Sequence, residues 1–226
     1  MNLTFSTPAL SVDISILMFQ LEKKYLGDTP YIEGSIVPNN LADIYADIVQ
    51  RRDEIYPNCL SVSNPSDFDY VTTDWESYHD YIALEKFPQL DFILLYIKQS
   101  LELMEDTNEY YFKSWINIWP QGQSLGYHTH YGQWHGYYVI KDTGTKTFYF
   151  PDSIKEPVGL DNYDGHFIFM NSKVPHLAQL NPSTEFRVSI GFNLSSSQEI
   201  DREVRTNANG RGDKIKNVIT PLKELI

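Results

Sequence analysis

Cysteine is almost absent from this sequence of 226 residues, because Cys59 is the only one. An internal disulfide and a cysteine-based zinc site are therefore both excluded. Long apolar runs are also missing, and the first residues, MNLTFSTPALSVDISILMF, lack the basic start of a signal peptide. We expect a soluble cytoplasmic protein without a membrane partner.

Basic residues are scarce as well. The chain has 18 Lys and Arg against 30 Asp and Glu, which gives a net charge of −12. No local cluster of Lys and Arg offsets this charge, and a negative surface repels the phosphate backbone of nucleic acids. We therefore expect no nucleic-acid partner. The oligomeric state is left open between a monomer and a homodimer.

Aromatic residues, in contrast, make up 14 % of the chain, with 16 Tyr and 12 Phe. These residues favour strands and aromatic-lined pockets. The length suits a single domain over residues 1–226. We predict mostly helical support in residues 1–109, a β core in residues 110–195, and a polar C-terminal extension in residues 196–226.

Two amphipathic helices are predicted, over residues 39–56 and 89–104. Asn39 or Asn40 can cap the first helix, and Pro57 lies just beyond its end. The apolar residues of each helix recur at spacings of three and four, which places them on one face. They are Leu41, Ile44, Tyr45, Ile48 and Val49 in the first helix, and Ile93, Ile97, Leu101 and Met104 in the second.

After Glu109 the apolar pattern changes to a period of two, which is typical of strands. The predicted strands cover residues 114–119, 137–141, 146–150, 166–170 and 186–193. Short strands at this spacing indicate a sandwich or barrel. The expected class is α+β, with the helices packed on one sheet and the other sheet lining a cavity.

The histidines are concentrated in the β part. His128 and His130 stand two residues apart in YHTHYG, and residues i and i+2 of a strand point to the same face. His176 follows 48 residues after His128, so a neighbouring strand end could supply a third metal ligand and leave open positions for other ligands. His135 and His166 compete for a ligand role, whereas His79 is expected to be structural.

Arg187 and Ser189 share one face of the segment FRVSIGF, in which Phe186, Val188 and Ile190 occupy the other face. A buried Arg needs an anionic partner, and its planar guanidinium suits a carboxylate. A bound carboxylate ligand and a structural ion pair with Asp or Glu both satisfy this requirement.

The ordered motifs SWINIW, HTH, GYYV, GHFIFMNSKVPH and FRVSIGFN resemble a bacterial and phage branch of the 2-oxoglutarate/iron(II) oxygenase superfamily. The resemblance covers residues 88–194 and implies a double-stranded β-helix, a jelly-roll barrel like that of cupins. The wider superfamily has Asp or Glu where this chain has His130. The branch has Ser-Gly where this chain has His135-Gly136, which places His135 near the site with its role open.

The resemblance implies a role for each matching residue. His128, His130 and His176 would bind Fe(II), and Arg187 with Ser189 would bind the distal carboxylate of 2-oxoglutarate. Asn117 and Tyr127 would also contribute to the cosubstrate pocket. Aromatic residues on the neighbouring strands are expected to form the apolar walls, namely Trp115, Trp119, Trp134 and Tyr138.

The resulting hypothesis is a dioxygenase that hydroxylates a prolyl or other protein residue, or a small molecule. One alternative is a three-histidine cupin-type dioxygenase that oxidises its substrate without 2-oxoglutarate and does not need Arg187. Another is a jelly-roll binding or structural protein without catalysis, which would not bind a metal tightly.

Overall fold

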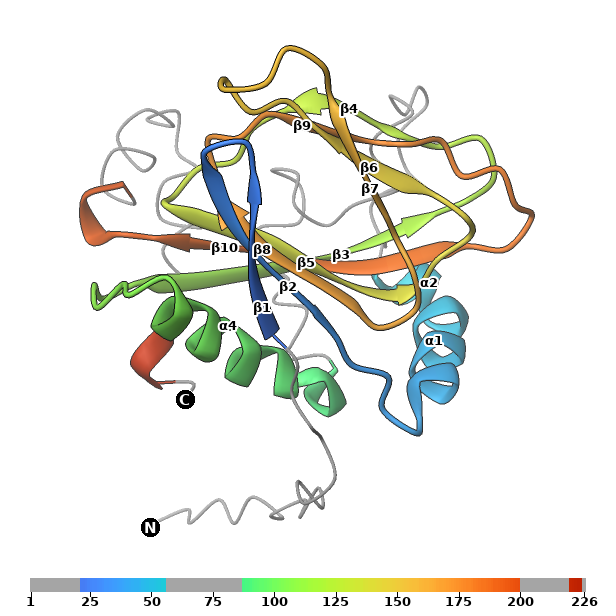
Figure 1. Cartoon of the computed structure of the whole chain (residues 1–226). Helices are drawn as coiled ribbons and strands as arrows, with labels where there is room; N and C mark the ends of the chain where they lie inside the picture. The colour runs from blue at the N-terminus through green and yellow to red at the C-terminus, as the bar shows by residue number, and fades with distance from the viewer. Residues whose placement is uncertain (1–20, 56–86, 200–219, 225–226) are drawn as a thin grey trace, which may run out of the picture.

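The computed structural model describes residues 21–55, 87–199 and 220–224, which form two antiparallel β-sheets with helices on one side (Figure 1). The larger sheet has seven strands in the order β1-β2-β8-β5-β10-β3-β11. Their bounds are β1 Leu21–Leu26, β2 Thr29–Ser35, β8 His166–Asn171, β5 Trp134–Lys141, β10 Arg187–Ser195, β3 Tyr111–Trp119 and β11 Thr220–Pro221. The smaller sheet has the order β4-β9-β6-β7, with β4 Leu125–His128, β9 His176–Ala178, β6 Lys146–Tyr149 and β7 Val158–Asp161.

The helices α1 (Leu41–Gln50) and α4 (Phe92–Leu103) lie on the face of the larger sheet opposite the smaller sheet (Figure 1). Short helical turns accompany them: α2 (Arg52–Ile55), η4 (Pro88–Leu90) and η5 (Leu222–Glu224). Helix α1 buries Leu41, Ile44 and Ile48 in the main core, as its spacing predicts. No helix within the described ranges is long and apolar enough to cross a membrane.

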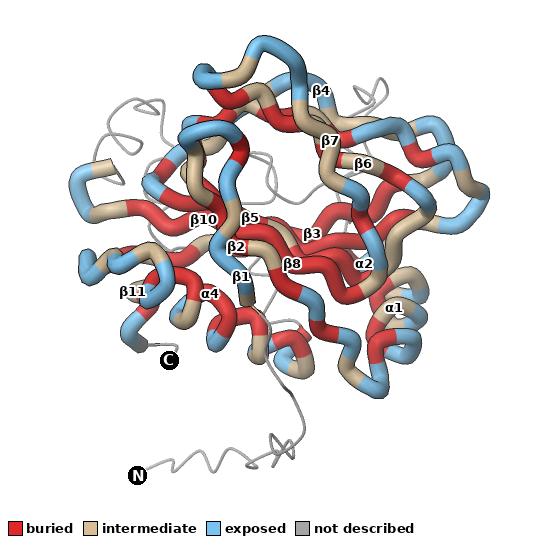
Figure 2. The backbone as a smooth tube through the Cα atoms, in the orientation of Figure 1, coloured by how far each residue is buried: buried red, intermediate tan, exposed pale blue. Residues whose placement is uncertain are grey.

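Strand β10 separates the main core from the space between the sheets. Val188, Ile190 and Phe192 are fully buried and belong to the core under the helices. Arg187 and Ser189 alternate with them and therefore face the smaller sheet. Figure 2 shows the same division, with buried central strands and exposed loops around the smaller sheet. The predicted fold class is confirmed: the molecule is an α+β double-stranded β-helix with helices packed on one sheet.

The N-terminal part contributes strands as well as helices, which differs from the mostly helical support predicted for residues 1–109. A hairpin of β1 and β2 turns at Gly27 (φ 61°), and β2 pairs with β8 to extend the larger sheet. Strand β1 is an edge strand with several exposed residues, so its sequence LEKKYL lacks a clean apolar alternation. His79 lies outside the described residues.

The C-terminal extension also joins the sheet, because β11 pairs with β3 through Thr220 and Pro221. In addition, the backbone N–H of Leu222 donates a hydrogen bond to the Tyr110 carbonyl (2.9 Å), and Leu222 is buried in the main core. At least this part of the predicted polar extension is therefore packed against the domain.

Candidate metal centre and its pocket

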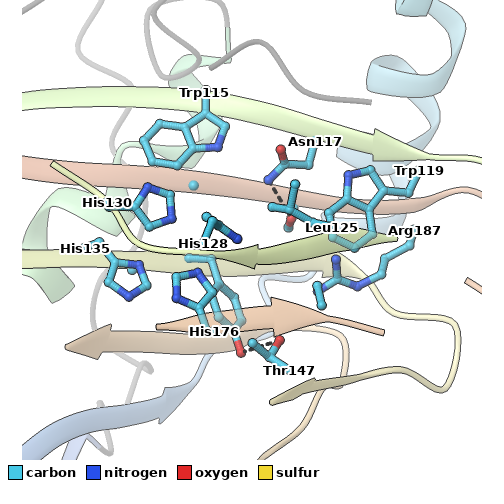
Figure 3. A pocket seen from close by; sticks show the side chains of 15 residues that line it. Trp115, Asn117, Trp119, Leu125, His128, His130, His135, Thr147, His176 and Arg187 are labelled. Carbon is cyan, nitrogen blue, oxygen red and sulfur yellow. Dashed lines mark hydrogen bonds between the residues drawn. The ribbon is translucent and has the colours of Figure 1, made fainter. Parts of the chain in front are cut away.

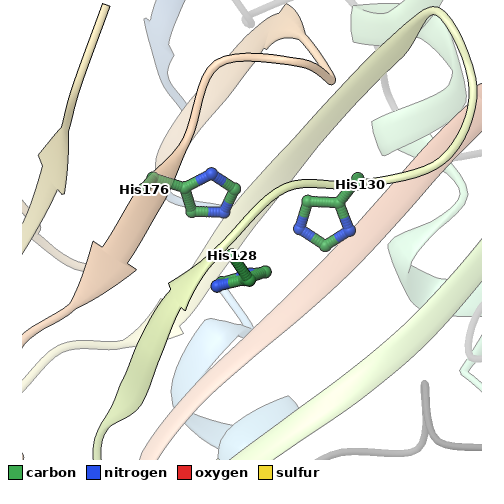
Figure 4. Close-up of side chains that lie close together, drawn as sticks. All are labelled: His128, His130 and His176. Atoms are coloured by element: carbon green, nitrogen blue, oxygen red, sulfur yellow. The ribbon is translucent and has the colours of Figure 1, made fainter.

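Two neighbouring strands of the smaller sheet bring His128 and His176 together. His128 ends β4, His176 begins β9, and the two residues are direct partners across this antiparallel pair. His130 lies in the loop that follows β4, where its backbone N–H donates to the Ser172 carbonyl (3.0 Å). The three imidazoles therefore come from three short segments around one point (Figure 4).

The three side chains have the spacing of a metal-binding cluster. One ring nitrogen from each of His128, His130 and His176 lies within 4.8 Å of the others. Their ring centroids are 4.3 to 5.1 Å apart. Three nitrogens bound to one ion at about 2.0–2.1 Å lie roughly 3–3.5 Å from one another, so nitrogens as far apart as 4.8 Å would move closer together when an ion binds.

Hydrogen bonds assign the tautomers of two of these histidines. Nδ1 of His128 lies 2.7 Å from the Gly126 carbonyl oxygen, and Nδ1 of His176 lies 3.1 Å from the Val174 carbonyl oxygen. A carbonyl oxygen only accepts, so both Nδ1 atoms must carry the proton. The lone pair of each ring is then on Nε2, the arrangement that a metal ligand requires.

Burial keeps the ligand candidates neutral. It lowers the pKa of His130 to about 3 and the pKa of His176 well below its usual value, and in both rings the nearby His128 adds to the effect. A neutral imidazole is the form that binds a metal ion, so neither His130 nor His176 needs to lose a proton first near neutral pH.

The histidines open onto a pocket between the two sheets with a cavity volume of about 50 Å³. Figure 3 shows Arg187 and Trp119 at one end and His130 and His135 at the other. The pocket is lined by Trp115, Asn117, Trp119, Leu125, His128, His130, His135, Gly136, Tyr137, Thr147, His176, Ala178, Arg187, Ser189 and Gly191.

Arg187 is buried at its end of the pocket, with 3 % of its surface exposed. The centre of its guanidinium lies 4.5 Å from the centroid of the Trp119 ring. Burial lowers the pKa of Arg187, and the nearby Tyr137 and Asp142 oppose this effect. Within the described part of the chain, neither Arg187 Nε nor Trp119 Nε1 has a hydrogen-bond partner.

Asp142 is the carboxylate next to Arg187, with 3.8 Å between Asp142 Oδ1 and Arg187 Nε. This distance is too long for a hydrogen bond. The Asp142 carboxylate instead accepts from the Gly144 backbone N–H (2.7 Å) and from the Thr145 hydroxyl (2.6 Å), so it stabilises its own turn. The sequence left open whether Arg187 forms a structural ion pair with an Asp or Glu. The structure shows only a long contact with Asp142, so Arg187 Nε can still donate a hydrogen bond to a ligand.

The sequence matches no protein-family model and no curated protein. Among solved structures, the non-heme α-ketoglutarate-dependent epimerase SnoN from nogalamycin biosynthesis aligns with 72 % of this chain and 76 % of its own, with a TM-score of 0.50 and 14 % identity. This chain has the fold of the 2-oxoglutarate/iron(II) oxygenase superfamily.

Two further solved structures align less closely. A prolyl-4-hydroxylase from Pseudomonas putida aligns with 75 % of this chain and 89 % of its own, with a TM-score of 0.45 and 18 % identity. An oxidoreductase of the 2OG-Fe(II) oxygenase family from Burkholderia pseudomallei aligns over 42 % of this chain, with a TM-score of 0.39 and 14 % identity. This chain spans about half of that relative's length, 49 %. The fold assignment rests on the alignment with SnoN.

Asn117 and Ser189 both line the pocket. They are cross-strand partners on β3 and β10, and Asn117 Nδ2 donates to Ser189 Oγ (3.2 Å). Both are almost fully buried. Next to them, Trp119 is the partner of Arg187 in the same register.

Tyr127 lies outside the pocket, which corrects its assignment as a cosubstrate residue. Its side chain is 63 % exposed and contacts Phe150 (centroids 5.1 Å apart). It precedes His128 in β4, and neighbouring strand residues point to opposite faces. His166 is also removed as a ligand candidate, because its Nε2 pairs with Glu33 (2.9 Å) on β2, away from the pocket.

Two of the predicted wall residues belong to the main core. Trp134 stacks on Phe169 (5.1 Å) and Tyr138 donates its hydroxyl proton to the Ile36 carbonyl (2.7 Å). On β5 the alternate residues His135 and Tyr137 face the pocket instead.

Tyr137 and Thr147 are pocket residues that the sequence did not single out. The Tyr137 hydroxyl lies 3.2 Å from Thr147 Oγ1 and 3.0 Å from Asn162 Oδ1. Consistent application of strand parity to residues 134–141 would have identified Tyr137. Nothing in the sequence around Thr147 distinguishes it from an ordinary strand residue.

Proposed function

We propose that this protein is an Fe(II)- and 2-oxoglutarate-dependent dioxygenase that hydroxylates a substrate at the mouth of this pocket. The observation that carries the proposal is the presence, in one pocket, of a three-imidazole cluster and a buried guanidinium. Together these groups match a divalent metal ion and a dicarboxylate ligand.

The donor set fits iron. His128, His130 and His176 offer three neutral nitrogens, and three ligands on one side of an ion leave positions open for exogenous ligands. With Fe(II) and 2-oxoglutarate bound, dioxygen would be reduced as the cosubstrate is decarboxylated to succinate and a substrate C–H bond is hydroxylated. Three imidazoles also suit zinc or nickel, so the isolated protein is expected to contain these ions in place of part of the iron.

The other end of the pocket fits a carboxylate. Arg187 Nε and Trp119 Nε1 are buried donors without a partner in the part of the chain that the structure describes, and an unsatisfied buried donor costs about 1–3 kcal/mol. In our proposal Arg187 binds the distal carboxylate of 2-oxoglutarate, assisted by Ser189. Tyr137 and Thr147 place two further hydroxyl groups on the same pocket.

The substrate would be a prolyl or other protein residue, or a small molecule. It would approach past Tyr127 and Tyr131, which are 63 % and 68 % exposed and adjoin His128 and His130 in the sequence. Walls formed by Trp115 and Trp119 would exclude water from the reacting bond.

A three-histidine dioxygenase that acts without 2-oxoglutarate is the second candidate. It is favoured by one specific observation: the metal cluster found among the described residues contains no carboxylate. This candidate does not require the buried Arg187, whose charge would then be opposed, among the described residues, by the long contact to Asp142.

Anaerobic absorption spectroscopy tests the proposal. Fe(II) and 2-oxoglutarate together should produce a visible charge-transfer band that neither produces alone, and His176→Ala should abolish it. Iron binding without the charge-transfer band would support the second candidate. A lack of iron binding would instead indicate a non-catalytic jelly-roll protein.

A further inference from the structure

His135 is a fourth histidine in the pocket, with 2 % of its surface exposed. It lies on β5, opposite Asn193 of β10 and Met170 of β8. Its side chain therefore points to the same face as that of Tyr137, between the two sheets.

The ring of His135 packs against two of the ligand candidates. Its centroid is 4.6 Å from that of His176, with an angle of 5° between the planes, and 4.7 Å from that of His130, with an angle of 20°. Among the described residues the metal cluster consists of His128, His130 and His176 without His135. His135 therefore lies beside the proposed metal position and outside its set of protein ligands.

The Nε2 atom of His135 has no hydrogen-bond partner in the described part of the chain, although it is buried. A buried ring nitrogen without a partner is costly, and sites of this kind are usually completed by a ligand or an ordered water. Carboxylate groups of 2-oxoglutarate and dioxygen offer only acceptor atoms. A partner for these ligands must therefore donate.

We propose that His135 is a ligand-binding residue of the metal centre, whose Nε2–H donates a hydrogen bond to an acceptor atom of the ligand at an open metal position beside His130 and His176. The inference rests on the proposed function, because it requires a metal ion at the three histidines. It assigns His135 a contact with the exogenous ligand and none with the metal.

Cobalt(II) and azide provide a test that does not depend on turnover. Cobalt replaces iron, its visible bands report ligand exchange, and azide is an anion that only accepts hydrogen bonds. His135→Phe keeps a ring in the stack and removes both nitrogens, whereas His135→Gln keeps an N–H donor. His166→Gln is the control, because His166 is a buried histidine on β8 outside the pocket and Gln can still donate to Glu33.

Wild-type protein, His135→Gln and the control should bind azide at the cobalt centre with affinities that agree within about threefold. His135→Phe should bind cobalt normally but bind azide about tenfold more weakly, the size of one lost hydrogen bond to a charged group. Thermal unfolding of each variant confirms that it is folded.

Unchanged azide affinity in His135→Phe would overturn the proposal, because a packed ring without nitrogens would then be enough for azide binding. Loss of cobalt binding in a folded His135→Phe protein would overturn it as well, because His135 would then support the metal itself. A wild-type protein that does not bind cobalt would contradict the proposed function, which separates the two failures.

Discussion

Replacement of Arg187 by Met should weaken 2-oxoglutarate binding more than any other single change at that end of the pocket. Met retains an unbranched apolar side chain that can pack on Trp119, but it removes the positive charge and all five N–H donors. The substitution therefore tests the charge and the hydrogen bonds with little change in packing.

The expected loss of affinity follows from the burial of Arg187 and from the absence, among the described residues, of a hydrogen-bond partner for its Nε. Only 3 % of the residue is exposed, and the distance from its Nε to Asp142 Oδ1 is 3.8 Å. A bound carboxylate would thus be its main counter-charge, and loss of one member of such a buried pair costs about 2–5 kcal/mol. The dissociation constant should rise by at least about 30-fold. Arg187→Lys should be intermediate, because it keeps the charge and loses the planar, bidentate geometry.

Calorimetry on the metal-loaded protein measures this change directly. Arg52→Met is a suitable control, because Arg52 also lies over an aromatic ring, that of Phe186 (5.2 Å), but is partly exposed outside the pocket. If Arg187 served only as the ion-pair partner of Asp142, then Arg187→Met and Asp142→Asn would both lower the unfolding free energy, and 2-oxoglutarate affinity would not change. That result would refute the assignment.

Three other predictions concern the metal ligands and acid stability. His176→Ala should abolish stable iron binding and leave the melting temperature nearly unchanged; full metal occupancy in the variant would place the third ligand elsewhere. His130→Asp should keep iron, as in the commoner triad of the superfamily, whereas His130→Ala should lose most of it. A metal-bound crystal structure with a His130 ring nitrogen beyond about 3 Å from the ion, against about 2.0–2.1 Å for a ligand, would contradict this role. Finally, the hydrogen bond from His166 lowers the pKa of Glu33 from 4.5 to about 2. Because the pKa is depressed in the folded state, the stabilisation is present above pH 4.5 and is lost as the pH falls from there towards 2. Urea unfolding of Glu33→Gln should show a weaker pH dependence in this window; an unchanged profile would refute the linkage.

The alternation of core-facing and pocket-facing side chains in β10 could be predicted from the sequence because two constraints coincide there. Apolar residues must reach the core under the helices, and a strand then turns every other side chain to the opposite face. The presence of Arg187 and Ser189 in the same pocket as the histidines follows from this alternation. The apolar face of α1 could be predicted in the same way, because the residues on one face of a helix recur with a period of 3.6 residues.

Residues beside the site were harder to assign, because proximity in sequence is not proximity of side chains. Tyr127 adjoins His128 but points outwards, and Tyr138 adjoins Tyr137 but points into the core. Strand β9, with only three residues, and the edge strand β1 are too short or too exposed to give a clear period. The packing of His135 on two other histidines depends on β4, β5 and β9 together, so no local pattern could predict it.

The register between β3 and β10 connects the hydrophobic core to the chemistry of the pocket. Trp119 lies opposite Arg187, and four residues further along β10 Gly191 lies opposite Trp115. A Cβ atom at Gly191 would lie only 2.4 Å from the Trp115 ring, so the glycine leaves the space in which this ring packs. Trp115 in turn stacks on His130, with 5.4 Å between centroids. A slip of one residue would turn both tryptophans and the guanidinium into the core. The apolar residues that fix the register under the helices therefore also fix which groups meet the proposed metal ligands.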